Sequence, residues 1–207
     1  MVESFTYEKD RSLDSNVMNA HQKASLGTAN LLKYVEDYYR MNDDFDSIVG
    51  LSQIMQAEAI RFAVEAHRRN MPYCMGTLYW QFNDCWPVIS WSSIDYGGNW
   101  KALHYAARKF FSPILVSIRD LDDKIEIHVI NDQHHEVESR IRLGLFNLNG
   151  DILFKDSSEI NVEPFSSTIY CAFNKKNLLG GSDPSAIVFR AELFVGGKVL
   201  SRAHQFF

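Results

Sequence analysis

The hydrophobic pattern of this 207-residue chain changes its period near Pro113, and this change constrains the fold more than any other feature. Before Pro113, apolar residues recur at spacings of three and four, as on one face of a helix. After Pro113, apolar and polar residues alternate, as in a strand with one buried face. The sequence therefore predicts two parts of different architecture, residues 1–111 and residues 112–207.

Three segments of the first part are predicted to be helical, because their apolar residues fall on one helical face. Asp14 or Ser15 is the candidate N-cap of the first segment, and Asp46 is that of the second. Gly27 is a candidate break within the first segment. The three segments are residues 15–40, 46–69 and 101–111.

A short apolar run, residues 73–82, lies between the second and third helical segments and predicts a buried parallel strand. All four tryptophans of the chain follow within 21 consecutive residues. They are Trp80, Trp86, Trp91 and Trp100. For the last three, burial in an aromatic core and a role in binding are equally compatible with the sequence.

Trp80 is the strongest candidate for a functional residue. It stands at the carboxyl end of the predicted strand, near Asn83 and Asp84, which is where α/β folds place their ligand sites. An aromatic ring can stack on the C–H face of a sugar, while amide and carboxylate groups bind its hydroxyls. These residues indicate a sugar-binding wall.

Catalytic carboxylates are harder to find in the sequence. Asp84 and Asp95 could form the carboxylate pair of a glycosidase, but Asp95 precedes Gly97 and Gly98, so a turn explains it better. Glu58 and Glu65 lie in a helical segment, where a solvated face is expected for glutamates. The chain therefore shows no convincing catalytic pair.

The second part predicts about seven strands, separated by turn-forming dipeptides. This pattern is typical of a small antiparallel β-sandwich. The turn signals are Asp122-Asp123, Asn149-Gly150, Gly180-Gly181 and Gly196-Gly197.

Composition excludes several function classes. A net charge of −5 without a basic cluster argues against nucleic-acid binding. The apolar runs are far shorter than the roughly 18 residues of a membrane-spanning helix, so a soluble chain without a membrane partner is expected. The three cysteines are expected to be free, and the histidines show no spacing typical of a metal site. The N-terminus carries no secretory signal, although a fragment would have lost one.

One long motif resembles a known family. The run from Met75 to Pro87, MGTLYWQFNDCWP, closely resembles the C-terminal part of β-mannosidases of glycoside hydrolase family 2. The similarity extends over essentially the whole chain. Further matching segments are Ser90–Tyr96, Trp100–Tyr105, Asp14-Ser15, His21–Lys23 and Gln53–Ala57.

The resemblance implies a mixed fold. Residues 1–111 would be the C-terminal portion of a (β/α)8 TIM-barrel catalytic domain, with residues 73–82 as its eighth strand. Residues 112–207 would be an accessory immunoglobulin-like β-sandwich. By the same resemblance, Trp80 would line the subsite of the mannosyl ring. The substrate-binding loop around it would be shaped by Asn83, Asp84 and Trp86.

The family resemblance also implies an activity, a retaining exo-β-mannosidase that hydrolyses terminal β-D-mannosyl residues of oligosaccharides without a cofactor. These enzymes use two glutamates. The family's Ser-Glu-Phe/Tyr-Gly nucleophile motif is absent, and Glu3 lies in another context. We therefore expect no catalytic residue in this chain, which would be a C-terminal fragment that is inactive alone.

Two alternatives remain open at this stage. The chain could be a non-catalytic carbohydrate-binding or structural module, or part of a related β-galactosidase or β-glucuronidase. The apolar segment 73–82 also predicts self-association through an exposed barrel surface. The resemblance leaves the compartment of the parent enzyme open among periplasmic, secreted and lysosomal.

Overall fold

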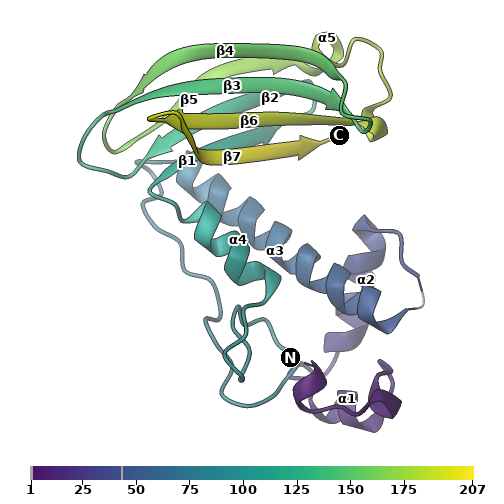
Figure 1. The fold of residues 1–207 in the computed structure, drawn as a ribbon. Helices are drawn as coiled ribbons and strands as arrows, with labels where there is room; N and C mark the ends of the chain where they lie inside the picture. Colours follow the sequence, from purple (N-terminus) through teal and green to yellow (C-terminus); the bar gives the residue numbers. More distant parts are fainter. Residues whose placement is uncertain (1, 43) are drawn as a thin grey trace. The chain divides into compact units, whose positions relative to one another are not determined.

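A computed structural model describes residues 2–42 and 44–207, which form two compact units (Figure 1). The first unit comprises residues 1–63 and 77–108, and the second comprises residues 64–76 and 109–207. Within the described residues, no helix combines the length and the hydropathy needed to cross a membrane. The domain limits of 1–111 and 112–207 remain a prediction.

The predicted helical segments are confirmed, with two differences. The first segment is split, and its second half begins at Gly27. Ser15 caps the first half, because its hydroxyl accepts a hydrogen bond from the Met18 amide at 3.1 Å. The carboxylate of Asp44, rather than Asp46, accepts from the Ser47 amide at 2.9 Å at the start of the long helix. The helices are α1 (Asn16–Ala20), α2 (Gly27–Tyr38), α3 (Phe45–Arg69) and α4 (Ala102–Phe110), preceded by 3-10 turns at Val2–Ser4 and Glu8–Asp10.

The predicted barrel portion is wrong for this structure. Residues 73–82 do not form a strand, and every strand of the described residues lies in the second unit. A parallel strand forms only when neighbouring strands pair with its backbone N–H and C=O groups, and the first unit supplies isolated bridges alone. Tyr73 and Leu78 are accordingly 95% and 101% exposed. Helices and irregular loops therefore build the first unit.

The predicted β-sandwich fits the second unit. Figure 1 shows its seven antiparallel strands in two sheets, with the strand orders β1-β2-β5 and β4-β3-β6-β7. The short helix α5 (Lys175–Leu179) and a 3-10 turn at Pro184–Ala186 were not expected. Gly180 and Gly181 end α5 with positive φ angles instead of closing a hairpin. The strands are β1 (Ile114–Asp120), β2 (Lys124–Asn131), β3 (Val137–Asn147), β4 (Ile152–Val162), β5 (Ser166–Asn174), β6 (Ile187–Val195) and β7 (Lys198–Phe206).

The core of the second unit lies between its two sheets. It is formed by the alternating apolar residues of the strands, as a period of two predicts. Ile125, Ile127, Phe189 and Leu193 have no exposed surface. Full burial of a side chain of this size contributes about 1.5–3 kcal/mol to folding.

The other face of the β1-β2-β5 sheet carries buried polar residues, and the last turns of α3 hydrogen-bond to it. The Ser117 hydroxyl donates to Glu65 at 2.6 Å, and the Arg69 guanidinium donates to Ser117 at 2.6 Å. Glu65 is only 4% exposed, so its predicted place on a solvated face is wrong. Its carboxylate tolerates burial because a hydroxyl and a guanidinium surround it. Glu58 is exposed as expected and pairs with Arg61 at 2.6 Å.

His128 of β2 lies in the same buried layer. Its Nε2 is 3.5 Å from the Glu126 carboxylate, and its Nδ1 has no hydrogen-bond partner among the described residues. Burial lowers the pKa of His128 below its ordinary value, as do the nearby Arg69 and Arg119, and Glu126 only partly opposes this. The folded protein therefore favours the neutral imidazole.

We expect the free energy of unfolding of the second unit to decrease as the pH falls from about 6.5 towards 5. In this window the unfolded chain binds a proton at His128 that the folded chain resists, so acid favours unfolding. The substitution His128→Gln should reduce this dependence of the free energy of unfolding on pH only in part, because burial also lowers the pKa of His204. Urea unfolding followed by circular dichroism at several pH values measures this dependence. An unchanged dependence on pH in His128→Gln would contradict the assignment.

Candidate functional site

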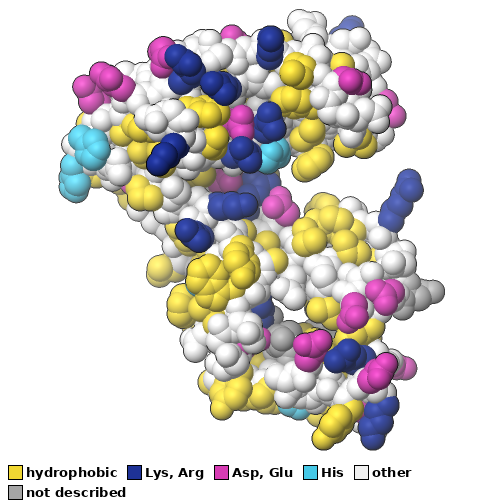
Figure 2. Space-filling model, viewed as in Figure 1, with side chains coloured by type: hydrophobic (Ala, Val, Ile, Leu, Met, Phe, Trp, Pro, Cys, Tyr) yellow, Lys and Arg dark blue, Asp and Glu magenta, His cyan; other side chains and the backbone are white. Residues whose placement is uncertain are grey.

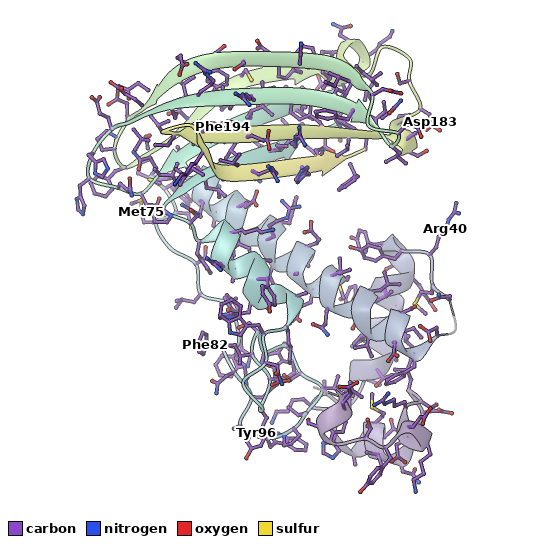
Figure 3. The ribbon with its side chains drawn as sticks, viewed as in Figure 1. Arg40, Met75, Phe82, Tyr96, Asp183 and Phe194 are labelled. Carbon is purple, nitrogen blue, oxygen red and sulfur yellow. The ribbon has the colours of Figure 1, made fainter. Side chains whose placement is uncertain are left out.

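The candidate site lies in the irregular loops of the first unit that precede α4. Figure 3 shows Phe82 and Tyr96 on these loops. Backbone hydrogen bonds join the segment around Asp84 to the segment around Ile94. The Asp84 amide donates to the Ile94 carbonyl at 3.2 Å, and the Ile94 amide donates to the Phe82 carbonyl at 2.9 Å. The loops therefore have a defined conformation without a regular strand.

A buried ion pair anchors the loops. One Asp84 oxygen accepts from Ser90 at 2.5 Å, and the other accepts from Ser92 at 2.6 Å and from Lys101 at 3.2 Å. The side chains of Asp84 and Lys101 are 2% and 5% exposed. Burial lowers the pKa of Lys101, while the adjacent carboxylate opposes the shift. We call these four residues the Asp84–Lys101 cluster.

Asp95 forms the turn that the sequence predicts. Its carboxylate accepts from the Asn99 amide at 2.8 Å, and Gly98 adopts a φ of 83° that favours glycine. Asp84 is likewise bound to two serines and a lysine. Asp84 and Asp95 therefore both stabilise the conformation of the loops.

Trp80 presents its ring to solvent, with 74% of the residue exposed. The side chain of the next residue, Gln81, connects two parts of the loop. It accepts from the Trp91 indole N–H at 3.1 Å and donates to the Asn83 carbonyl at 2.8 Å. The peptide bond between Trp80 and Gln81 is cis. An exposed indole on a fixed loop can stack against an apolar ligand face.

The other two predicted residues differ in their surroundings. Asn83 is exposed and its backbone pairs with Ile94 in an isolated bridge. Trp86 is half-buried, with its ring 5.5 Å from the His21 ring, which stacks on Phe5 at 4.2 Å. Trp86 therefore packs within the first unit.

The four predicted site residues do not form one contact group. Of these four residues, only Asn83 and Asp84 are joined by a hydrogen bond in the described part of the chain. The Asn83 side-chain amide donates to the Asp84 carbonyl at 3.5 Å. Sequence reasoning missed Ser90, Ser92 and Lys101. Such residues usually lie at the surface, and no spacing rule connects a lysine to an aspartate 17 positions away in a loop.

Comparisons with known proteins agree with the sandwich. Residues 123–207 match the family model described as "Mannosidase Ig/CBM-like domain". The chain is 32% identical over 157 residues to a β-mannosidase of Capra hircus. The matched region covers 69% of this chain and 18% of that protein. It is 27% identical over 216 residues to β-mannosidase B of Aspergillus flavus, covering 94% of this chain and 25% of that protein. The chain thus spans a quarter or less of these relatives.

Solved structures extend the similarity to the first unit. A β-D-mannosidase from Dictyoglomus thermophilum superposes with a TM-score of 0.91 at 30% identity, covering 98% of this chain and 24% of that one. The exo-chitosanase CsxA of Amycolatopsis orientalis, at 18% identity and a TM-score of 0.79, shares the fold. The resemblance that the sequence predicts is confirmed: the chain is similar, over nearly its whole length, to the C-terminal part of β-mannosidases of glycoside hydrolase family 2.

Proposed function

We propose that this chain is the C-terminal part of a retaining exo-β-mannosidase and that Trp80 forms the wall against which the terminal mannosyl ring packs. The observation that carries the proposal is the exposed Trp80 ring on loops anchored by the Asp84–Lys101 cluster. A stacking ring is effective only when it is held in place, since an immobile side chain loses little entropy on binding. The similarity to β-mannosidases supplies the substrate class.

The remaining site residues have distinct roles in this proposal. The exposed amide of Asn83 is available for sugar hydroxyls. Asp84 and Trp86 act through structure, Asp84 by holding Ser90 and Ser92, and Trp86 by packing against His21. Both shape the loop and need not touch the substrate.

The 207-residue chain alone is proposed to be inactive. Retention requires two carboxyl groups about 5–5.5 Å apart, one as nucleophile and one as acid and base. Within the described helices, Glu58 is paired with Arg61 and Glu65 is buried beside Ser117. The two glutamates of the reaction are therefore proposed to lie outside this chain, and the reaction needs no cofactor.

The test compares this chain with a form extended by the upstream sequence of its own gene. The extended form should release p-nitrophenol from the aryl β-mannoside, and the short chain should not. Aryl β-galactoside and β-glucuronide serve as competing substrates. Cleavage of either in preference to the mannoside would refute the mannosidase proposal and indicate a related glycosidase. An inactive extended form would refute the enzymatic proposal and indicate a binding or structural module. Activity of the short chain would refute the proposed inactivity.

In the extended form, Trp80→Ala should lower kcat/KM on the aryl mannoside by about 100-fold, because the ring that orients the sugar is lost. Leu78→Ala is the matched control, since Leu78 is also an exposed apolar residue on the same segment. Initial rates of both variants measure the effect. Equal losses in the two variants would contradict a specific role for Trp80.

We further propose that the chain self-associates through the exposed aromatic residues of the first unit. Trp80, Phe82 and Tyr105 are more than half exposed, and contiguous apolar surface favours association. Light scattering after size-exclusion chromatography should give a mass that grows with concentration. Phe82→Ser should reduce this growth, whereas Phe206→Ser, on the exposed end of β7, should not. A concentration-independent monomer would refute the proposal.

A further inference from the structure

A groove of about 580 Å³ lies on the outer face of the β4-β3-β6-β7 sheet. Four cationic side chains and the Glu192 carboxylate line it, although the chain as a whole has a net charge of −5. Figure 2 shows Lys and Arg side chains gathered over these strands. The residues are Arg140, Arg142, Lys155 and Arg190 with Glu192.

The register of the sheet places these residues side by side. Gly144 of β3 pairs with Lys155 of β4 and with Arg190 of β6. The Phe146 ring lies across Gly144, where an added Cβ would come within 2.6 Å of a ring carbon. Glycine at this position thus lets the ring lie low over the sheet.

Two arginines that line the groove stack on aromatic rings. The Arg190 guanidinium carbon is 4.5 Å from the centroid of Phe146, and that of Arg142 is 4.2 Å from the centroid of Phe194. Stacking orients each guanidinium and leaves its N–H groups free at the edges. The covered rings cannot stack on a neutral sugar, whereas the exposed N–H edges suit a carboxylate.

The positive charge of the groove is only partly neutralised. Glu192 accepts from Arg202 at 2.6 Å and lies 3.7 Å from Arg190. Arg142 and Lys155 form no ion pair within residues 2–42 and 44–207. Two cations of neighbouring strands are therefore available to an acidic ligand.

We propose that this groove binds an acidic oligosaccharide, a sugar chain that bears carboxylate groups. Arg142, Arg190 and Lys155 would bind its carboxylates, and the Glu192 carboxylate would accept a hydrogen bond from one of its hydroxyls. An acidic peptide fits less well, because it lacks hydroxyls for the Glu192 carboxylate to bind and that carboxylate repels it.

The proposal is tested by titration calorimetry of the 207-residue chain with trigalacturonic acid as the probe and mannotriose as the neutral control. Trigalacturonic acid should bind, mannotriose should not, and raising NaCl from about 50 to about 500 mM should weaken binding. Arg142→Gln and Arg190→Gln should each weaken binding about tenfold. Arg40→Gln, the same change at an exposed arginine of the first unit, should have no effect.

Three results would overturn the proposal. They are absence of binding by trigalacturonic acid, equal binding by mannotriose, and binding of hexaglutamate as tight as that of trigalacturonic acid. Thermal unfolding of each variant verifies its fold, and Arg142→Lys, which keeps the charge, should retain part of the affinity. Trp80→Ala should leave this binding unchanged, so the outcome is independent of the proposed mannosidase function.

Discussion

The substitution Asp84→Asn is expected to destabilise the first unit by about 3–5 kcal/mol. It leaves the Lys101 ammonium group, which is 5% exposed, without its anionic partner. The amide that replaces the carboxylate can no longer accept from Ser90, Ser92 and Lys101 together. An uncompensated buried charge is among the largest single-residue penalties.

Urea unfolding followed by tryptophan fluorescence measures this effect, because all four tryptophans lie in the first unit. Glu58→Gln is the matched control, since it breaks a half-exposed ion pair with Arg61 and should cost no more than about 1 kcal/mol. Combining Asp84→Asn with Lys101→Met removes both charges and should recover part of the loss. An Asp84→Asn variant as stable as the parent would show that the cluster does not anchor the loops.

The second large effect is expected in the core of the sandwich. Phe189 of β6 is fully buried, and its ring centroid lies 5.9 Å from that of Phe173. Phe189→Ala removes this ring and leaves a cavity between the two sheets, at an expected cost of about 3–5 kcal/mol. Urea unfolding followed by circular dichroism of the strands, with hydrogen exchange of β3 and β6, measures it.

Phe206→Ala provides the comparison, since Phe206 is 67% exposed at the end of β7 and its removal leaves no cavity. Its effect should be about 0.5 kcal/mol or less. Tryptophan fluorescence should report little change in either variant, because the second unit contains no tryptophan. Equal destabilisation by the two alanines would contradict the assigned core.

The residues that sequence reasoning placed correctly are those governed by local rules. The spacing of apolar residues along α3 and the alternation along β3 follow from helix and strand geometry. Ser15 and Asp95 satisfy nearby backbone amides, so a few neighbouring residues suffice to predict their roles. The role of Trp80 in substrate binding stays a prediction, with which its exposed ring is compatible.

Tertiary structure decided what depends on distant partners. Residues 73–82 have the composition of a strand but lack neighbouring strands to pair with, so they remain irregular. Glu65 belongs to a helical face that could have been solvated, and Ser117 of β1 makes its burial tolerable. The sequence by itself thus determined the two hydrophobic periods and the family resemblance. Only the three-dimensional structure brought Asp84 to Lys101 and the arginines of β3 and β6 to one groove, because side chains far apart in sequence meet only after folding.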